Sequence, residues 1–409
     1  MRDVLVTGLG VISPAGNGRD EFFDNLLAGR SGIRRLSSPF APQLAARIGG
    51  EVAFDAAARF PKPKLALLDR FSQFALAAAR EALDDAGIGE GDPRKPRAGV
   101  YLGTGLGGAQ TTEAGYVELL TNGKDRLPPY TVVRAMNNAA TAHISIDFAL
   151  RGASLTFSTA CSSSAIAIGE ACRAIRHGYI DFAVAGGAES LLTLGTIRAW
   201  EALRTLATED ADDPGASCRP FSRDRTGLVL GEGAGIVVLE AEAHARQRGA
   251  KAYARLAGYG ATSDSSHLTK PDQAGQAAAM RMALEDAGIA PAEIGYVNAH
   301  GTATLAGDQV ETAAIKEVFG AHASRLAVSS TKSMHAHLMG ATGAVEFIAA
   351  ILALERGALP PTAHLRVPDP ECDLDYVPNV ARTGVELAAV MSNSFAFGGS
   401  NAVLVATRA

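Results

Sequence analysis

One cysteine and two histidines of this 409-residue sequence follow apolar segments typical of strands. Cys161 ends one such segment and is followed by three serines, where a helix is expected to begin. First-turn N–H groups and the helix dipole stabilise a thiolate there, so we expect a lowered pKa and a nucleophilic thiol. His300 follows a second apolar segment, and His337 precedes a Gly/Ala-rich helix. Because loops at the carboxyl ends of strands converge, we expect the three side chains to share one site.

The other cysteines and most other histidines lack such a setting and are expected to be structural: Cys172, Cys218, Cys372, His143, His177, His244, His322 and His364. No CxxC pair or zinc-type histidine spacing is present, so we expect reduced thiols and no metal. Lys332 is either a solvated surface lysine or, beside a buried site, the partner of a carboxylate such as Glu346. The residues alone leave both interpretations open.

The segment 103–108 matches the GxGxxG pattern of dinucleotide-binding loops and offers a rival function. Such a site also needs an acidic residue after a second strand about 20 residues further on. Asp125 lies instead within a polar turn. We therefore discount a nucleotide-dependent oxidoreductase, which would bind NAD(P).

Composition restricts the class of protein that positions these residues. The chain is 47% hydrophobic and carries 38 Lys plus Arg against 43 Asp plus Glu, a net charge of −5. A mildly acidic balance argues against nucleic-acid binding, and no apolar run approaches the length of a membrane span. The N-terminus lacks the apolar core of a signal peptide, so we expect a cytoplasmic protein.

An internal repeat indicates how the chain is organised. Six of seven positions are identical between 82–88 (ALDDAGI) and 283–289 (ALEDAGI), and each copy is followed by strands, Gly-rich loops and a small-residue helix in the same order. This predicts two α/β halves with mixed sheets, helices packed between the sheets, and a boundary near residue 250. The segment 105–150 has no counterpart in the second half and is expected to be an insertion that shapes a substrate channel or a subunit interface.

These motifs resemble those of the β-ketoacyl-acyl carrier protein synthases, condensing enzymes of the thiolase superfamily. The matching segments span almost the whole chain: 6–10, 159–163, 219–221, 231–235, 298–302, 330–333 with His337, and 393–401. The order Cys, His, His is that of the elongating synthases. The resemblance implies a thiolase-like duplicated fold of αβαβα layers, with halves 1–250, which carries Cys161, and 251–409, which carries both histidines and a gating loop.

The resemblance also implies a role for each matching residue. Cys161 would accept an acyl group, and His300 and His337 would hydrogen-bond the thioester carbonyl during decarboxylation of a malonyl group. The N–H groups of Cys161 and Phe397 would form the oxyanion hole. The other implied residues are the gate, Phe395 and Phe397; the phosphopantetheine contacts, Thr302 and Thr304; and the supporting charges, Lys332 and Glu346.

By the same resemblance, the substrates arrive on the phosphopantetheine of an acyl carrier protein, and no cofactor is bound. Carrier docking is expected at Lys62, Lys64, Arg70 and Arg204, although the segment 64–70 is more apolar than in relatives. Ala142, Ala336 and Ala396 stand where many relatives have glycine, which would stiffen a loop or narrow the channel. His335 is expected to be structural.

Fatty-acid synthesis is the leading pathway, and a type II polyketide or aryl-polyene ketosynthase is the alternative. A homodimer is expected, and a heterodimer with a chain-length-factor paralogue fits the alternative. The chain itself could be such a catalytically silent partner, but the presence of Cys161, His300 and His337 argues against that hypothesis.

Overall fold

The same order of strands occurs twice in the structure, a computed structural model that describes residues 1–409. In both halves the successive pairings are parallel, parallel, antiparallel and antiparallel. The first half has the order β6 (Ser154–Phe157), β5 (Ala98–Gly103), β7 (Phe182–Glu189), β8 (Gly233–Ala241) and β1 (Val4–Ser13). The second has the order β11 (Ala327–Ser329), β10 (Ile294–Asn298), β14 (Ala389–Phe395), β15 (Ser400–Thr407) and β9 (Ala254–Ser263). The predicted duplication and mixed strand pairing are confirmed.

The two five-stranded sheets meet at one edge. Strands β1 and β9 pair antiparallel at Leu5 with Arg255 and at Val6 with Ala254. Each is the last strand of its own half, so its outer N–H and C=O groups are free to pair. Together with β2 (Gly16–Asn17), which pairs with β1, the strands form one continuous eleven-stranded sheet.

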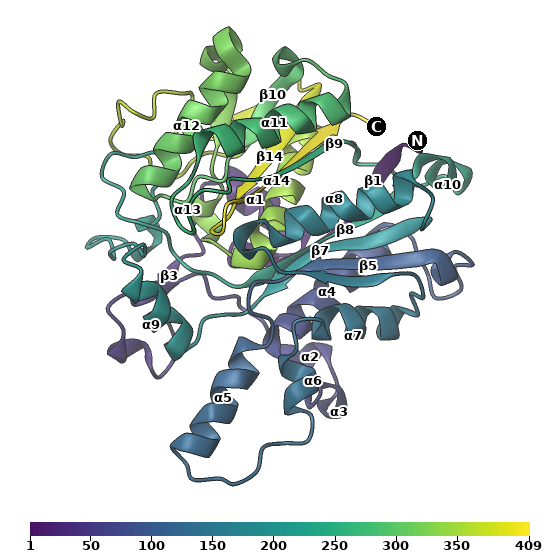
Figure 1. Cartoon of the computed structure of the whole chain (residues 1–409), viewed down its shortest axis with the longest axis vertical. Coiled ribbons are helices and arrows are strands. Elements are labelled where there is room, and N and C mark those ends of the chain that lie inside the picture. Colours follow the sequence, from purple (N-terminus) through teal and green to yellow (C-terminus); the bar gives the residue numbers. More distant parts are fainter.

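Helices lie between and outside the two halves of this sheet, as Figure 1 shows. The central layer consists of α8 (Ser163–Arg176) and α14 (Thr342–Arg356). The outer layers contain α4 (Arg70–Asp85) and α7 (Ala139–Phe148) on the first half, and α11 (Gln273–Ala287) and α12 (Leu305–Phe319) on the second. The expected αβαβα layering is therefore present.

Local sequence explains why these helices form where they do. Every residue of α14 from Thr342 to Leu354 is buried, as expected for a helix that is apolar on all sides. The repeated helices α4 and α11 are each followed by a glycine in the left-handed region, Gly87 and Gly288, both with φ 67°. Glycine adopts this conformation without steric cost, so the conserved ending of the repeat stops both helices.

The main hydrophobic core belongs to both halves. It contains 50 buried residues and lies around α8 and α14, with contributions such as Val6 and Ile168 from the first half and Phe347 and Leu404 from the second. Small side chains permit this close packing: a Cβ on Gly103 would lie 2.3 Å from the backbone of Ser163. The halves are thus joined by a common core as well as by the sheet.

The insertion 105–150 forms α5 (Ala109–Leu120), α6 (Thr131–Ala135) and α7. The remaining helices and strands are short: α1 (Arg19–Leu27), α2 (Ala56–Arg59), α3 (Lys62–Leu65), α9 (Leu194–Ala202), α10 (Glu242–Gln247), α13 (Lys332–His335), β3 (Arg34–Arg35), β4 (Ile48–Gly49), β12 (Ala358–Leu359) and β13 (Arg382–Thr383). The 3-10 helices are η1 (Ala41–Gln43), η2 (Lys95–Arg97), η3 (Ala160–Ser162), η4 (Pro214–Ala216), η5 (Pro291–Glu293), η6 (Gly320–Arg325) and η7 (Met339–Ala341). None of the helices combines the length and apolar character that crossing a bilayer requires.

Candidate active site

Cys161 lies in the turn between β6 and α8 and is 5% exposed. Ser163 fixes this turn: its hydroxyl accepts the N–H of Thr159 (2.9 Å) and donates to the carbonyl of Ala160 (2.7 Å). The expected lowering of the thiol pKa is wrong for this state of the protein. Burial raises the pKa of Cys161 to about 11, and this outweighs the lowering by Lys332 and by the N–H groups of Phe397 and Cys161. The helix start is where the sequence placed it, but the loss of hydration dominates.

His337 follows α13, and its Nε2 lies 3.0 Å from Cys161 Sγ. Its Nδ1 accepts the N–H of Met339 (3.2 Å) and lies 2.8 Å from Thr342 Oγ1. A ring nitrogen that accepts from an amide carries no proton, so the proton of the neutral ring is on Nε2. Burial, followed by the charge of Lys332, holds the pKa of His337 well below its usual value. His337 is therefore a neutral hydrogen-bond donor that faces the sulfur.

His300 follows β10 and is held through its backbone. Its N–H and that of Gly301 donate to the two carboxylate oxygens of Glu311, at 2.8 and 2.7 Å. Its ring stands at 85° to that of His337, with centroids 5.5 Å apart. The ammonium of Lys332 lies 3.4 Å from Nδ1 and can only donate, so here too the proton is on Nε2. Burial, followed by Lys332, keeps the pKa of His300 well below its usual value.

Lys332 and Glu346 form a fully buried ion pair behind the histidines, with 2.6 Å between Nζ and Oε1. Lys332 Nζ also donates to the carbonyl oxygen of His300. Burial raises the pKa of Glu346 to about 8, although Lys332 acts in the opposite direction. Of the two interpretations of Lys332, the buried pair is the one present. Lys332 does not line the cavity, so it acts through His300 and is a positioning residue. His335 bonds to Thr331 and to the carbonyl of Ala336, an arrangement consistent with a structural role.

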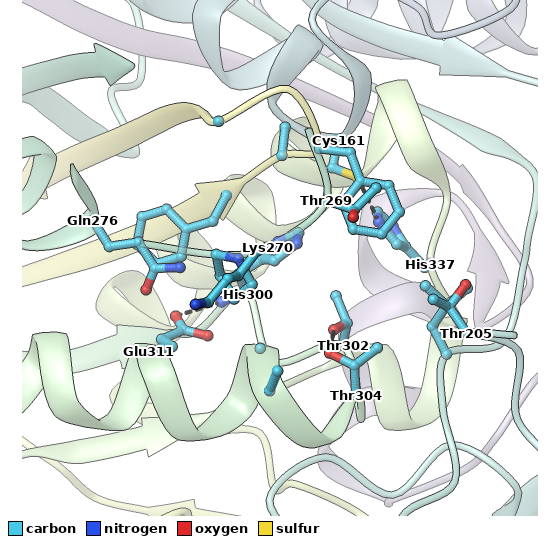
Figure 2. A pocket seen from close by; sticks show the side chains of 18 of the residues that line it. Cys161, Thr205, Thr269, Lys270, Gln276, His300, Thr302, Thr304, Glu311 and His337 are labelled. Carbon is cyan, nitrogen blue, oxygen red and sulfur yellow. Dashed lines mark hydrogen bonds between the residues drawn. The ribbon is translucent and has the colours of Figure 1, made fainter. Parts of the chain in front are cut away.

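A cavity of about 230 Å³ connects these groups. Cys161, His300 and His337 line it together with Thr302, Thr304, Phe395 and Phe397. Figure 2 shows the two threonines on the opposite side of the cavity from Cys161, and their Oγ1 atoms are 3.0 Å apart. The structure therefore brings together every substrate-facing residue that the sequence analysis singled out.

The loop that follows β14 contains the two predicted gate residues. Phe395 is buried at the end of the strand, and its ring is 6.1 Å from that of His300. Phe397 lies in a turn with two left-handed glycines, Gly398 (φ 87°) and Gly399 (φ 74°). The backbone N–H of Phe397 acts on the sulfur of Cys161 and lowers its pKa, in opposition to burial. This places one of the two expected oxyanion-hole donors at the nucleophile.

The sequence analysis missed several cavity residues, among them Trp200, Lys270 and Gln276. Trp200 is the only tryptophan of the chain, and its ring stacks on Phe397. Gln276 is a polar residue in an alanine-rich helix and is buried, with no partner for its Oε1 atom. These two unusual residues were visible in the sequence, but their position at the cavity depends on the tertiary fold. Lys270 has no sequence signal that distinguishes it from a surface lysine.

The expected docking cations are in different environments. The guanidinium of Arg70 forms a close ion pair with Glu232 (2.6 Å), so a docking partner would have to compete with that carboxylate for its charge. Lys64 pairs with Asp147, and neither it nor Lys62 lines the cavity. Arg204 lies between two cavity residues, 203 and 205. Of the four cations, only Arg204 is adjacent in sequence to residues that line the cavity.

The three alanines that stand where many relatives are expected to have glycine differ in backbone conformation and in their position relative to the cavity. Ala336 has φ 66° and ψ −174°, a region that non-glycine residues enter at a cost of about 1–3 kcal/mol. Ala396 lines the cavity. Ala142 is half-buried on α7 and does not line the cavity. Ala336 therefore stands where a stiffened loop is expected and Ala396 where a narrowed passage is expected, while the effect of each methyl group on the channel stays a prediction.

The donor atoms of Cys161, His300 and His337 lie within 4.8 Å of one another, a spacing that a metal ion could bridge. Zinc binding through Nε2 normally requires the other ring nitrogen to donate a proton to an acceptor. In both histidines Nδ1 faces a donor instead, Met339 N–H or Lys332 Nζ. The site is therefore suited to donating hydrogen bonds to an oxygen atom rather than to ligating a metal.

Comparisons with known proteins agree with this geometry. Residues 1–245 match the family model "Beta-ketoacyl synthase, N-terminal domain", and residues 253–366 match "Beta-ketoacyl synthase, C-terminal domain". The 3-oxoacyl-[acyl-carrier-protein] synthase 2 of Coxiella burnetii is 43% identical over 410 residues, covering 100% of this chain and 99% of that protein.

Two solved structures are similar over the whole chain. One is the ishigamide ketosynthase/chain length factor, with a TM-score of 0.92, 36% identity, and coverage of 100% of this chain and 99% of that one. The other is a type II PKS acyl-carrier protein in complex with its ketosynthase bound to the hexaketide (AntDE:AntF), with a TM-score of 0.91, 32% identity, and coverage of 100% and 99%.

Proposed function

Because the chain belongs to the β-ketoacyl synthase family, we propose that it is a 3-oxoacyl-[acyl-carrier-protein] synthase that joins an acyl group on Cys161 to a malonyl thioester. It is an acyltransferase that forms carbon–carbon bonds. One observation carries the catalytic assignment: two neutral imidazoles present Nε2–H groups in one cavity, and one of them is 3.0 Å from the only cysteine that lines it.

The first step is acyl transfer. The sulfur of Cys161 attacks the thioester carbonyl of an acyl carrier protein, and the bond from that carbonyl to the pantetheine sulfur breaks. The thiol proton of the cysteine leaves on the pantetheine sulfur. The N–H groups of Cys161 and Phe397 stabilise the negative oxygen of the tetrahedral intermediate. Because the pKa of Cys161 is raised, the thiol is protonated in the resting protein, and its proton leaves during the attack.

The second step is decarboxylation of the malonyl thioester. Its C–C bond to the carboxylate breaks, CO₂ leaves, and the electron pair forms an enolate. The thioester oxygen then carries negative charge, and the Nε2–H groups of His300 and His337 donate to it. Neutral rings suit this role because each Nε2 retains a proton, and Lys332 maintains that tautomer in His300.

The third step forms the new carbon–carbon bond. The enolate carbon attacks the acyl carbonyl on Cys161, and the tetrahedral intermediate expels the cysteine sulfur. That sulfur takes one proton from solvent, which restores the thiol. The products are a 3-oxoacyl carrier protein, CO₂ and free Cys161.

The substrate arm is proposed to enter past Thr302 and Thr304, whose hydroxyls line the cavity. An acidic carrier protein would dock around the mouth. Arg204 and Lys270 are exposed there without an ion pair to offset their charge, and Leu203 and Leu268 are exposed apolar neighbours. No separate cofactor is needed, because the carrier's phosphopantetheine brings the substrates.

A dimer through β6 is part of the proposal. This strand is the free edge of the first half, and Leu155 on it is 46% exposed. Exposed apolar side chains continue onto the insertion, including Ile146 (72%), Val132 and Leu120. An unpaired edge beside an apolar patch favours pairing with a second chain across a two-fold axis.

For the pathway, fatty-acid synthesis is proposed first, on the similarity to the synthase of Coxiella burnetii. A type II polyketide or aryl-polyene ketosynthase is the second candidate, supported by the similarity to the two ketosynthase structures. The homodimer belongs to the first and a heterodimer with a chain-length-factor paralogue to the second. A cytoplasmic location is also proposed, in keeping with four free cysteines.

Intact-protein mass spectrometry tests the function. The protein is incubated with acyl carrier proteins of graded chain length, and the expected result is a mass increase of one acyl group that Cys161→Ala abolishes. Adding malonyl carrier protein should remove that mass and yield a 3-oxoacyl carrier protein. Condensation by Cys161→Ala would refute the assignment, and the preferred chain lengths would separate the two pathways.

A further inference from the structure

The ring of Trp200 stacks on the ring of Phe397, with centroids 5.7 Å apart and planes 20° from parallel. Both rings line the active-site cavity. Trp200 comes from α9 in the first half, whereas Phe397 lies in the gate loop of the second half. The contact therefore connects the gate to an element outside the loop itself.

Trp200 is held on a fixed element. The carboxylate of its neighbour Glu201 accepts the N–H groups of Ala45 and Ala46, at 2.7 and 2.9 Å. At the start of α9, the N–H groups of Leu194 and Gly195 donate to the carboxylate of Glu113, at 2.9 and 2.7 Å. Both ends of the helix are thus anchored to other parts of the first half.

Phe397 has more freedom. Gly398 follows it with φ 87°, and a Cβ at that glycine would meet no atom within 4 Å, so there is open space around the turn. The loop is tied to its neighbour through two backbone bonds, Gly398 N–H to Leu268 O and Asp264 N–H to Gly399 O. Since the N–H of Phe397 acts on the sulfur of Cys161, moving this residue changes both the position of its ring and the electrostatic environment of the sulfur.

We propose that Trp200 is a positioning residue that holds Phe397 in the closed state of the gate and thereby sets the order in which the two substrates react. This inference rests on the proposed function. With the rings stacked, the Phe397 N–H stays at the sulfur for acyl transfer. An acyl group on Cys161 competes for the space beside Phe397, the stack opens, and the malonyl thioester enters. Loss of the stack should open the unacylated gate about 2- to 10-fold more often, the range typical of an aromatic pair.

The chemical test compares Trp200→Leu with Trp200→Phe. Leucine retains apolar bulk without a ring, whereas phenylalanine can still stack. We measure the decarboxylation of malonyl carrier protein without an acyl donor, divided by the rate of condensation with one. The ratio should rise about 2- to 10-fold in Trp200→Leu and stay near the wild-type value in Trp200→Phe. An unchanged ratio in folded, acylated Trp200→Leu would overturn the proposal.

The wild-type protein provides a second test, because its single tryptophan makes intrinsic fluorescence a direct report on this contact. Acylation is followed by mass spectrometry and by tryptophan emission in the same sample. We expect the emission to change in step with the acyl mass, and the change to be absent in Phe397→Leu, which has no ring to stack. If acylation occurs without a change in emission, the role of Trp200 is wrong. If no acylation occurs, the proposed function is wrong instead.

Discussion

The two halves of the molecule share a framework but contribute different chemistry. In the first half, β6 leads to the sulfur of Cys161, whereas in the second half β10 and β11 lead to His300 and to the segment that carries Lys332 and His337. The loops after β5 and β10 occupy equivalent places, and a buried glutamate holds each one through backbone N–H groups: Glu189 holds Gly105 and Leu106, and Glu311 holds His300 and Gly301. The two glutamates come from elements that are not equivalent, β7 and α12. The comparison therefore teaches that duplication reproduced the strand framework, whereas the supporting and reacting side chains differ between the halves.

The halves also control charge in different ways. Burial raises the pKa of the sulfur in the first half, and the N–H groups around it offset this only in part. In the second half, burial and, after it, the charge of Lys332 hold the pKa values of both imidazoles well below their usual value, so the rings are neutral. The thiol of Cys161 is therefore protonated before the reaction and must lose its proton, whereas His300 and His337 already have the neutral form that donates hydrogen bonds.

Loss of the sulfur should have the largest effect. Cys161→Ala is expected to lower condensation by roughly 10³-fold or more, because no other cavity group can form the acyl intermediate. Rates are measured with acyl and malonyl carrier proteins. The matched control is Cys172→Ala, which removes a buried thiol from α8 outside the cavity and should retain activity. Equal losses in both variants would contradict the assignment.

Loss of one imidazole should be the next largest effect. His300→Ala or His337→Ala removes one donor to the enolate oxygen, so decarboxylation should fall roughly 10²- to 10³-fold. His177→Ala, at the end of α8, serves as the control. Decarboxylation is assayed separately from acylation of Cys161. If both His300→Ala and His337→Ala decarboxylate the malonyl thioester at the wild-type rate, the proposed role of these histidines in that step is wrong.

Unpairing the charge behind the histidines should reduce stability. Lys332→Met leaves Glu346 buried without its partner, which should lower the free energy of unfolding by about 3–5 kcal/mol. The double variant with Glu346→Leu should recover most of that loss. Denaturant titration of the wild type, both single variants and the double variant measures this coupling, and additive losses in the double variant would show that the two residues do not act as a pair.

The pH dependence of thiol reactivity tests whether burial raises the pKa of Cys161. Because the pKa of Cys161 is raised to about 11, its thiolate fraction should increase about tenfold per pH unit from pH 7 to 10. Iodoacetamide labelling, with the site identified by peptide mass spectrometry, should rise throughout this range. A plateau below pH 8 would instead show the lowered pKa that the sequence alone predicts.

The smallest effect is expected at the surface. Arg204→Gln should raise the KM for the carrier protein by about 2- to 5-fold at low salt and less at high salt. Arg70→Gln should leave KM unchanged and reduce stability, because its charge pairs with Glu232. If KM rises more in Arg70→Gln than in Arg204→Gln, the carrier protein docks near Arg70 and the proposed docking surface around Arg204 is wrong.

Sequence reasoning succeeded where the signal is local. The repeated helix ending, the strand before Cys161 and the motif around His300 are short segments whose geometry follows from their own residues. It failed where distant segments meet. Arg70 pairs with a residue 162 positions away, and Trp200 meets Phe397 across the two halves. The pKa of Cys161 belongs to the same group, because burial by the whole fold determines it.

The edge pairing of β1 with β9 also has a mechanical consequence. A chain of backbone hydrogen bonds runs through both halves without a break, and the central helices fasten them from the other side. The enzyme therefore has no joint about which one half could swing away from the other during turnover. We therefore expect the distance between the sulfur and the imidazoles to change little during turnover, and access to be controlled by residues that line the cavity. If the polypeptide is cut near residue 250, each fragment should expose the apolar residues that it contributes to the common core. We therefore expect neither fragment to fold without the other.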